Sequence, residues 1–309
     1  MKKICVTGGC GFIGANLVPK LAALGYCVTI FDNLSHGKQK YIKEIDKFAI
    51  IEGDIRDQNA LDRAINNHDS VIHLAAYGSV IESVASPEEN FSVNVVGTFN
   101  VLNAAHKANV TQLIFASTGG ALIGNTTPPV NENSIPKPIS PYGASKLAGE
   151  AYCCAFSNSY GISVTALRFA NVIGPLSWHK KGAMTTFIKA IQNNSPIHIY
   201  GDGSATRDFL YVDDLCSGII LALQKKLPGF NVMHLASGRE VSVRELACLV
   251  RNVALKPEHP ILFHQKRTGE VERNFASSDL AKSKLGFEPA YTLENAVELT
   301  YKWFQDYIL

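Results

Sequence analysis

Short apolar segments alternate with helical patterns through the first half of the chain, and this alternation limits the possible fold more than any other feature. The segments are KKICVTG, CVTIFDN, FAIIEGD, SVIHLAA, QLIFAST and SVTALRFA, and NVMHLAS follows much later. Nearly continuous apolar strands that are separated by helices are typical of a parallel sheet with both faces covered. The sequence therefore predicts an α/β fold with a doubly wound parallel sheet.

The alternation ends near Gly174, where loops, a helix around AMTTFIKAIQ and the strand PIHIYGDG follow. We predict a cofactor-binding sheet domain over residues 1–174, with returns near residues 205–238. Residues 175–309 then form mainly a smaller, interleaved α/β lobe. The length of 309 residues suits about two domains. Ligands of such sheets bind beyond the carboxyl ends of the strands, where a second lobe can close the crevice.

Composition argues against several classes of protein. A net charge of +2 is too small an excess of positive charge to indicate binding to nucleic acid or to an anionic membrane surface. Neither a secretory signal nor a membrane span is apparent, so we expect a soluble cytoplasmic protein. The seven cysteines include no CxxC pair and are expected in the core of a protein from a reducing compartment. The nine histidines lack zinc-ligand spacing, and we predict no metal.

A glycine-rich turn follows the first predicted strand. In VTGGCGFIG, Gly8, Gly11 and Gly14 lie between that strand and a predicted helix. Glycines allow a tight turn and a close backbone approach, so that free N–H groups and the positive end of the helix dipole can meet a pyrophosphate. An ordinary strand-to-helix loop is the alternative, but the context favours a dinucleotide site.

Acidic residues end the second and third predicted strands. Asp32 follows Gly14 by eighteen residues, where a carboxylate can accept two hydrogen bonds from an adenosine ribose. A 2′-phosphate would be repelled there, and no arginine follows directly, so the sequence favours NAD over NADP. Asp54 is a candidate partner for the adenine amino group, although turn chemistry alone could explain it.

The segment SPYGASKLAGEA places Tyr142 and Lys146 four residues apart. Ser140 and Pro141 are typical of a helix cap and first position, and the helix can run to Gly161. Residues four apart share a face, so the Lys146 ammonium can lie near the phenol and lower its pKa, as a general base for an alcohol requires. The spacing alone is also compatible with a packing face that bears a surface charge.

Together with FASTGG and the order of these motifs, the chain resembles the extended short-chain dehydrogenase/reductase family over essentially its whole length. The segments NVVGTFNVL, LRFANVIGP, GDGSATRDFLYVDDL and RTGEVERNFASSDLAKSKLGFEP are similar to the nucleotide-sugar epimerase and dehydratase branch, nearest the UDP-glucose 4-epimerases. The resemblance implies a Rossmann sheet, NAD as the cofactor, a UDP-sugar as the substrate, and a homodimer formed through helices at residues 93–108 and 142–160.

The resemblance also implies three groups of site residues. The catalytic residues are Tyr142, Lys146 and Thr118. The cofactor is bound by Gly8, Gly11, Phe12, Ile13, Gly14, Asp32, Asn33, Leu34, Asp54, Ile55, Leu74, Ala75, Ala76, Asn94 and Ser117, together with Tyr142 and Lys146. The substrate is bound by Ser79, Thr118, Asn171, Arg207, Arg267, Glu270 and Asn274, with the two arginines on its diphosphate.

The residues after Thr118 bear on the type of reaction. Members of the family share a first step, in which the sugar C4 hydroxyl gives its proton to the tyrosine and a hydride to NAD. The dehydratases then need a carboxylate pair directly after the threonine, and the decarboxylases usually have an acid nearby. Gly119 and Gly120 stand at those positions. The resemblance therefore implies 4-epimerisation, in which the 4-keto sugar rotates and takes the hydride back on its other face.

Some positions depart from the family pattern. The family's VYG is LIG at residues 122–124, and Ile173 replaces a common tyrosine, so two phenols are missing near the cofactor side of the site. Asn274 stands where a large tyrosine restricts some relatives to plain hexoses. We therefore expect UDP-GlcNAc and UDP-GalNAc to be accepted alongside UDP-Glc and UDP-Gal.

Other interpretations remain open at this point. The chain could be a UDP-uronate 4-epimerase, or another nucleotide-sugar oxidoreductase or dehydratase of this family. A non-catalytic NAD-binding protein is a third class, against which the intact Tyr142, Lys146 and Thr118 argue. Residues 178–181 are expected to form a solvated turn, with uracil or sugar contacts as the alternative, and His73 is expected to be a satisfied core residue.

Overall fold

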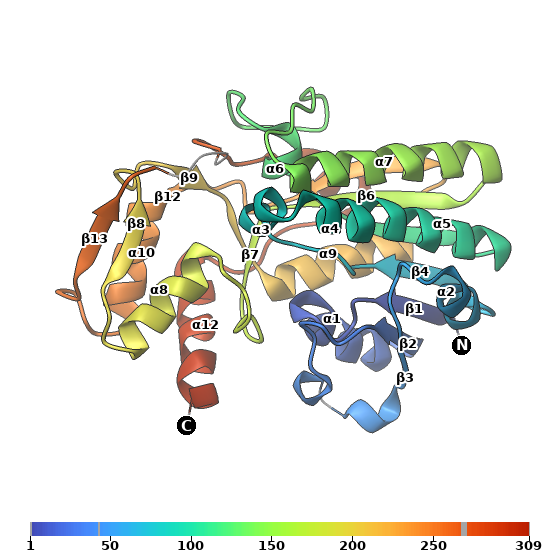
Figure 1. Cartoon of the computed structure of the whole chain (residues 1–309), viewed down its shortest axis with the longest axis horizontal. Helices are drawn as coiled ribbons and strands as arrows, with labels where there is room; N and C mark the ends of the chain where they lie inside the picture. The colour runs from blue at the N-terminus through green and yellow to red at the C-terminus, as the bar shows by residue number, and fades with distance from the viewer. Residues whose placement is uncertain (1, 43, 267–270, 309) are drawn as a thin grey trace.

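A seven-stranded parallel sheet forms the centre of the computed structural model, which describes residues 2–42, 44–266 and 271–308 (Figure 1). The strand order is β11-β6-β5-β4-β1-β2-β3. The bounds are β1 Lys3–Thr7, β2 Cys27–Asp32, β3 Ala49–Glu52, β4 Ser70–His73, β5 Gln112–Thr118, β6 Ser163–Phe169 and β11 Phe230–Leu235. Because β1 lies between β2 and β4, the order reverses there, which confirms the predicted doubly wound sheet.

Both faces of the sheet are covered, as the apolar strands predict. Cys5 and Val6 are neighbours in β1, and successive strand residues point to opposite faces. Cys5 belongs to an apolar cluster with Phe31, whereas Val6 belongs to a second cluster with Ile30. The first cluster includes side chains of α2 Gln58–Ile65, α5 Gly97–Lys107 and α7 Pro141–Tyr160. The second includes side chains of α1 Phe12–Ala23 and α9 Val212–Lys225.

Short elements connect the strands on the side of the predicted site. After β2 come two 3₁₀ turns, η1 Gln39–Tyr41 and η2 Ile45–Lys47. After β4 come α3 Val80–Ala85, α4 Pro87–Phe91 and the π-helical turn η3 Ser92–Val96, which runs directly into α5. After β5 comes α6 Gly120–Ile123, one turn long.

The smaller lobe lies beside the sheet in Figure 1. It contains α8 Ala183–Gln192, α10 Val243–Val253, α12 Leu293–Ile308 and the parallel pair β8 Ile197–Tyr200 and β13 Ile261–His264. Two short pairs lie between the parts, β7 Asn171–Ile173 with β10 Phe209–Tyr211 and β9 Thr206–Arg207 with β12 Val241–Ser242. The helix α11 Asp279–Leu285 packs against β11, which lies within the central sheet. The domain boundaries themselves stay a prediction.

Two expectations about single residues can be compared with the structure. His73 is buried, and its ring nitrogens lie 2.7 Å from Thr7 Oγ1 and 3.1 Å from Thr98 Oγ1, which confirms a satisfied core residue. The expectation that the cysteines lie in the core was wrong for Cys27 and Cys248, which are exposed because they occupy a strand start and a solvent-facing helix position.

Within the described residues, none of the helices has both the length and the apolar character needed to cross a membrane.

Candidate active site

The glycine-rich turn between β1 and α1 is closed by its own backbone. The N–H of Gly8 donates to the carbonyl of Phe31 at 2.8 Å, and the N–H of Gly11 donates to the carbonyl of Gly8 at 3.1 Å. Gly8 has a φ of +69°, which favours glycine. A Cβ on Gly14 would lie 2.5 Å from the Gly8 oxygen, and one on Gly8 would lie 2.6 Å from the Ala75 nitrogen. The turn is therefore a close-packed cradle at a helix N-terminus, which fits a pyrophosphate.

Asp32 ends β2 and is anchored on two loops. Its Oδ2 accepts from the N–H of Cys10 at 2.9 Å, and its Oδ1 accepts from the N–H of Leu34 at 2.8 Å. Burial raises the pKa of this carboxyl, and the two backbone hydrogen bonds oppose the rise. Leu34 has a φ of +57°, which turns the chain sharply after the carboxylate. Each oxygen keeps a further lone pair that a ribose hydroxyl could use.

Asp54 follows β3 and is held in a small polar network. Arg56 donates to it from Nε at 2.9 Å and from Nη2 at 2.8 Å, and Asn33 Nδ2 donates to Oδ2 at 3.0 Å. The hydrogen bonds from Arg56, helped by that of Asn33, lower the pKa of Asp54 to about 2. This network fixes Asn33 at the predicted adenosine end. Arg56 was not predicted from the sequence, although its position two residues after Asp54 could have indicated this pairing.

The loop after β4 is held by Asn94, a buried residue of η3. Asn94 Oδ1 accepts from the N–H of Tyr77 at 2.7 Å, and its Nδ2 donates to the Tyr77 carbonyl at 3.2 Å. The same Nδ2 lies 3.0 Å from Ser145 Oγ on α7. Asn94 therefore ties the loop of Leu74, Ala75 and Ala76 to the helix of the predicted catalytic pair. Single π-helical turns of this kind occur frequently at functional sites.

Helix α7 begins and ends where the sequence predicts. Ser140 Oγ accepts from the N–H of Gly143 at 3.2 Å, Pro141 stands at the first helical position, and Gly161 ends the helix with a φ of +74°. The N–H of Tyr142 donates to Ser83 Oγ at 3.1 Å. The cap and the serine of α3 thus fix the start of the helix and the position of Tyr142.

Tyr142 and Thr118 share a side-chain hydrogen bond, whereas Lys146 has a different partner. Lys146 is buried, and its Nζ donates to the carbonyl of Ala116 at 2.8 Å. Burial raises the pKa of Tyr142 to about 12, and the hydrogen bond with Thr118 opposes the rise. Lys146 is not among the groups that shift the pKa of Tyr142 in this structure, because its ammonium is directed at a strand carbonyl. The lowering of that pKa by Lys146 therefore stays a prediction. Burial also lowers the pKa of Lys146 to about 8.

A buried ion pair lies behind Lys146. Arg168 donates to Glu150 from Nε at 2.9 Å and from Nη2 at 2.8 Å, and Ser117 Oγ donates to the same carboxylate at 2.6 Å. The Ser117 hydroxyl therefore has a partner inside the protein, and its contact with the cofactor stays a prediction. Sequence reasoning missed Glu150, which lies four residues after Lys146 on the same helix.

The two glycines after Thr118 pack against side chains from later in the chain. A Cβ on Gly120 would lie 2.7 Å from Asn274 Nδ2, and one on Gly119 would lie 3.1 Å from His234 Nδ1. A side chain at Gly120 would require the Asn274 amide to move, and one at Gly119 would press on the His234 ring. Asn274 is buried, and its Nδ2 has no hydrogen-bond partner within the described part of the chain. Its amide therefore occupies the space into which a side chain at position 120 would extend.

The other substrate-site candidates occupy loop and edge positions. Ser79 caps α3 by accepting from the N–H of Glu82 at 3.2 Å. Asn171 Nδ2 donates to the carbonyl of Asp208 at 3.2 Å, and Arg207 Nη1 donates to that of Thr206 at 2.7 Å. Phe12 and Ile55 are buried. The predicted Arg267 and Glu270 lie outside the described residues.

Residues 178–181 were expected to form a solvated turn; the turn is present, but Trp178, His179 and Lys180 are half-buried, whereas Lys181 is exposed. The Trp178 ring lies 5.4 Å from that of Phe304 on α12. Lys189 Nζ donates to the Trp178 carbonyl at 2.6 Å and lies 4.1 Å from the ring centroid. The His179 ring stacks on His36 with a centroid distance of 6.3 Å. The expectation was therefore wrong in part, because an aromatic residue at the start of this segment anchors it on the smaller lobe.

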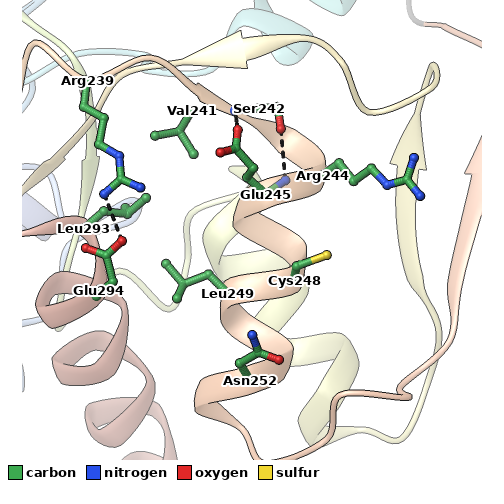
Figure 2. A pocket seen from close by; sticks show the side chains of 10 residues that line it. All are labelled: Arg239, Val241, Ser242, Arg244, Glu245, Cys248, Leu249, Asn252, Leu293 and Glu294. Atoms are coloured by element: carbon green, nitrogen blue, oxygen red, sulfur yellow. Dashed lines mark hydrogen bonds and ion pairs between the residues drawn. The ribbon is translucent and has the colours of Figure 1, made fainter.

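A separate hollow of about 450 Å³ lies in the smaller lobe (Figure 2). Arg239 pairs with Glu294 at 2.9 Å, and Glu245 forms a capping box with Ser242 at the start of α10. None of the predicted site residues that the structure describes lines this hollow. Among the described residues there is also no cluster of three or more His, Cys, Asp or Glu that could hold a metal.

Residues 4–234 match the model of the NAD dependent epimerase/dehydratase family. The chain belongs to this family. The UDP-glucose 4-epimerase of Thermotoga maritima, solved with UDP-glucose, is 35% identical, with a TM-score of 0.95 over 99% of this chain and 100% of that one. The UDP-glucose 4-epimerase of Thermus thermophilus, solved with NAD, is 33% identical, with a TM-score of 0.92 over 98% and 99% of the two chains.

A third solved relative carries a larger sugar. The UDP-N-acetylglucosamine 4-epimerase of Methanobrevibacter ruminantium, in complex with UDP-N-acetylmuramic acid, is 33% identical, with a TM-score of 0.92 over 99% of each chain. Membership of the NAD dependent epimerase/dehydratase family agrees with the geometry of the glycine turn, where a Cβ on Gly8 or Gly14 would collide with backbone atoms. The residues present therefore fit an NAD dinucleotide.

Proposed function

We propose that this protein is an NAD-dependent 4-epimerase that interconverts UDP-glucose and UDP-galactose. The proposal rests on one observation above all, the hydrogen-bonded pair of Tyr142 and Thr118 with Gly119 and Gly120 beside it. The pair can take a proton from a sugar hydroxyl, and the glycines offer no acid that could remove water or carbon dioxide afterwards. Relatives solved with UDP-glucose and with NAD support the choice of ligands.

The residues of this chain would divide the work as follows. The glycine cradle holds the pyrophosphate, Asp32 the adenosine ribose, and Lys146 the nicotinamide ribose. When bound, NAD supplies a hydride acceptor that returns the hydride in the same turnover. Tyr142 as the phenolate takes the proton of the C4 hydroxyl, and Thr118 donates a hydrogen bond that stabilises the phenolate. Tyr142 later returns the proton to the epimerised C4 oxygen.

Tyr142 must lose its proton to act as a base, so the charged groups beside it must lower its pKa. Burial, opposed by the hydrogen bond with Thr118, holds the pKa of Tyr142 at about 12, so a neutral phenol is favoured in the structure as described. A general base needs a pKa nearer the working pH. The positive charges that can shift it in the working enzyme are the Lys146 ammonium and the nicotinamide ring. We therefore propose that Lys146 exchanges its bond with Ala116 for the nicotinamide ribose when the ligands bind.

Asn274 supports a broader choice of sugars. Its Nδ2 is buried and has no partner in the described part of the chain, so this group can donate to an acetamido carbonyl. A buried donor gains most from such a bond because leaving it unpaired costs about 1–3 kcal/mol. We propose that UDP-GlcNAc and UDP-GalNAc are substrates as well.

An exposed apolar face supports a homodimer. The aromatic residues of this face come from α4, α5 and α7, and η3 adds a valine. Its members are Phe91, Val96, Phe99, Tyr152 and Tyr160. Phe99 and Tyr152 contact each other edge-on at 5.7 Å, so the face is continuous across two helices. We propose that two copies associate through it, which light scattering of the parent and of a Phe99→Glu variant would test, with a monomeric variant expected.

The function is tested by the spectrum of the purified protein. We expect bound NAD, and a rise in absorbance at the NADH band when UDP-glucose or UDP-galactose is added. The rise should be absent in Tyr142→Phe, although this variant keeps its NAD. A protein that binds NAD and UDP-sugars without any such change would contradict the proposal, and dehydrated or decarboxylated products would contradict the reaction type.

A further inference from the structure

Residues 178–181, here called the strap, cross from the glycine turn to the loop after β4. At one end, the His179 ring stacks on His36. The next residue, Gly37, packs on the glycine turn so closely that a Cβ there would lie 2.7 Å from Cys10 Cβ. The N–H of Lys38 also donates to the Cys10 carbonyl at 3.1 Å. This end of the strap therefore lies beside the segment that covers the pyrophosphate cradle.

The other end of the strap lies over the loop after β4. Lys181 forms an ion pair with Glu82 of α3. Between the two ends, Lys180 Nζ lies 3.9 Å from the place where a Cβ of Gly78 would be. The backbone before Gly78 is fixed, because Asn94 binds both polar groups of Tyr77. The Lys180 ammonium therefore lies close above Gly78 in this loop.

The Lys180 ammonium lies in a region of positive charge. Within the described residues, Lys180 forms no ion pair, and the nearby Glu82 is taken by Lys181. The charge of Lys180 contributes to the lowered pKa of Lys146, which shows that the two ammonium groups interact. Burial likewise lowers the pKa of Lys180, and the charge of Glu82 partly opposes this. Two neighbouring cations in a partly buried crevice are stabilised by an anion placed between or beside them.

We propose that Lys180 binds the diphosphate of NAD and that the strap retains the cofactor. The inference rests on the proposed function, in which Asp32 holds one ribose and Lys146 the other. The diphosphate then lies between these residues, over the glycine turn, and it is the anionic part of the cofactor that the strap crosses. An ammonium suits phosphate as a point charge. Retention of NAD is what an enzyme needs when it reduces and reoxidises its cofactor within each turnover.

Lys180 could instead bind the diphosphate of the nucleotide sugar, which has the same charge chemistry. The experiment distinguishes this ligand from NAD. The parent, Lys180→Gln, Lys180→Arg and the control Lys282→Gln are purified with their bound NAD. Lys282 is a matched control because it is an exposed lysine in an ion pair with Glu288 on α11 and its flank. Exchange of bound NAD for isotope-labelled NAD gives the dissociation rate, and UDP titration gives the affinity for the nucleotide.

We expect NAD to dissociate about 10-fold or more faster from Lys180→Gln, as loss of a charge-assisted bond implies. Lys180→Arg should stay within about threefold of the parent, Lys282→Gln should match the parent, and UDP affinity should be the same in all four. Unchanged NAD exchange in Lys180→Gln would overturn the proposal, and so would weakened UDP binding with normal NAD exchange. A parent that binds no NAD would overturn the proposed function as well.

Discussion

The two walls of the crevice differ in how their polar groups are satisfied. On the sheet wall, Asp32, Asn94 and Lys146 each have hydrogen-bond partners inside the protein, most of them backbone groups. On the wall formed by later segments, Asn274 Nδ2 and His179 Nδ1 are buried without a partner in the described part of the chain. The three named groups of the sheet wall are thus held by the fold itself, whereas Asn274 and His179 keep a donor or acceptor that a ligand could satisfy.

This difference assigns the chemical steps to the sheet wall and the choice of ligand to the other wall. Groups that are held by backbone hydrogen bonds keep a constant geometry, which proton transfer and cofactor orientation require. Groups that lack internal partners gain most from a ligand that satisfies them, so they discriminate between ligands. Changes on the sheet wall should therefore lower turnover on every substrate, and changes on the other wall should alter which ligands are bound or retained.

The largest effect is expected for Tyr142→Phe on the sheet wall. This change removes the general base but leaves the ring, so turnover should fall by about 10²–10⁴-fold on all substrates. NAD content and UDP affinity should stay at the parental level. Steady-state rates with UDP-glucose and UDP-galactose provide the measurement, and near-parental turnover would refute the assignment of the base.

A smaller effect is expected for Thr118→Val, with Thr118→Ser as the matched control. The Thr118 hydroxyl opposes the rise in the pKa of Tyr142, so its loss should raise that pKa further. A higher pKa leaves less phenolate at any pH below it. The low-pH limb of the kcat/KM profile should therefore move to higher pH, and the rate at neutral pH should fall about 10-fold. If the pH profile of Thr118→Val coincides with that of the parent, the Thr118 hydroxyl does not lower the pKa of Tyr142.

On the opposite wall, Asn274→Tyr should change selectivity. The larger ring would meet Gly120 and the sugar, so conversion of UDP-GlcNAc should fall about 10-fold while that of UDP-glucose changes little. Asn274→Ala leaves the space for the sugar open but removes the amide donor. Comparing the two variants therefore distinguishes a steric effect from the loss of a hydrogen bond. Equal rates of Asn274→Tyr and the parent on UDP-GlcNAc would show that this position does not select the sugar.

The last prediction concerns stability on the sheet side, where no effect on turnover is expected. Burial lowers the pKa of His73 to about 3, whereas an unfolded histidine titrates near about 6.5. Between these values the unfolded state binds the extra proton. The free energy of unfolding should therefore fall as the pH decreases through this window, by up to about 1.4 kcal/mol per pH unit from this residue.

Urea unfolding of the parent and of His73→Gln at several pH values tests this linkage. The variant should be less stable at neutral pH, and its stability should depend less steeply on pH between about 4 and 6. Equal slopes for the two proteins would mean that His73 binds its proton in the folded state as well.

The sheet wall was predictable from the sequence because local patterns determine it. Apolar strands bring their carboxyl ends to one edge of a parallel sheet, so Gly8, Asp32 and Thr118 had to lie close to that edge. The cap at Ser140 and the glycine at Gly161 likewise set the limits of α7. Roles of single residues at the site remain predictions, and the electrostatic effect of Lys146 on Tyr142 required knowledge of the burial of both groups.

The opposite wall was not predictable in the same way because contacts distant in sequence build it. Trp178 packs on α12, and Asn274 packs on Gly120, so neither position follows from a local pattern. The strap was expected to be solvated for this reason. The buried pair of Glu150 and Arg168 was missed as well, since the two residues come from a helix and a strand whose pairing depends on the whole sheet.

The central claim is that the hydride taken from C4 returns to C4 on the other face of the sugar. UDP-glucose deuterated at C4 tests it directly, with the UDP-galactose product analysed by NMR and mass spectrometry. The account predicts that the product keeps its deuterium at C4 and that no free NADH accumulates. Deuterium that moves to C6, with loss of water, or that remains in released NADH would contradict the account.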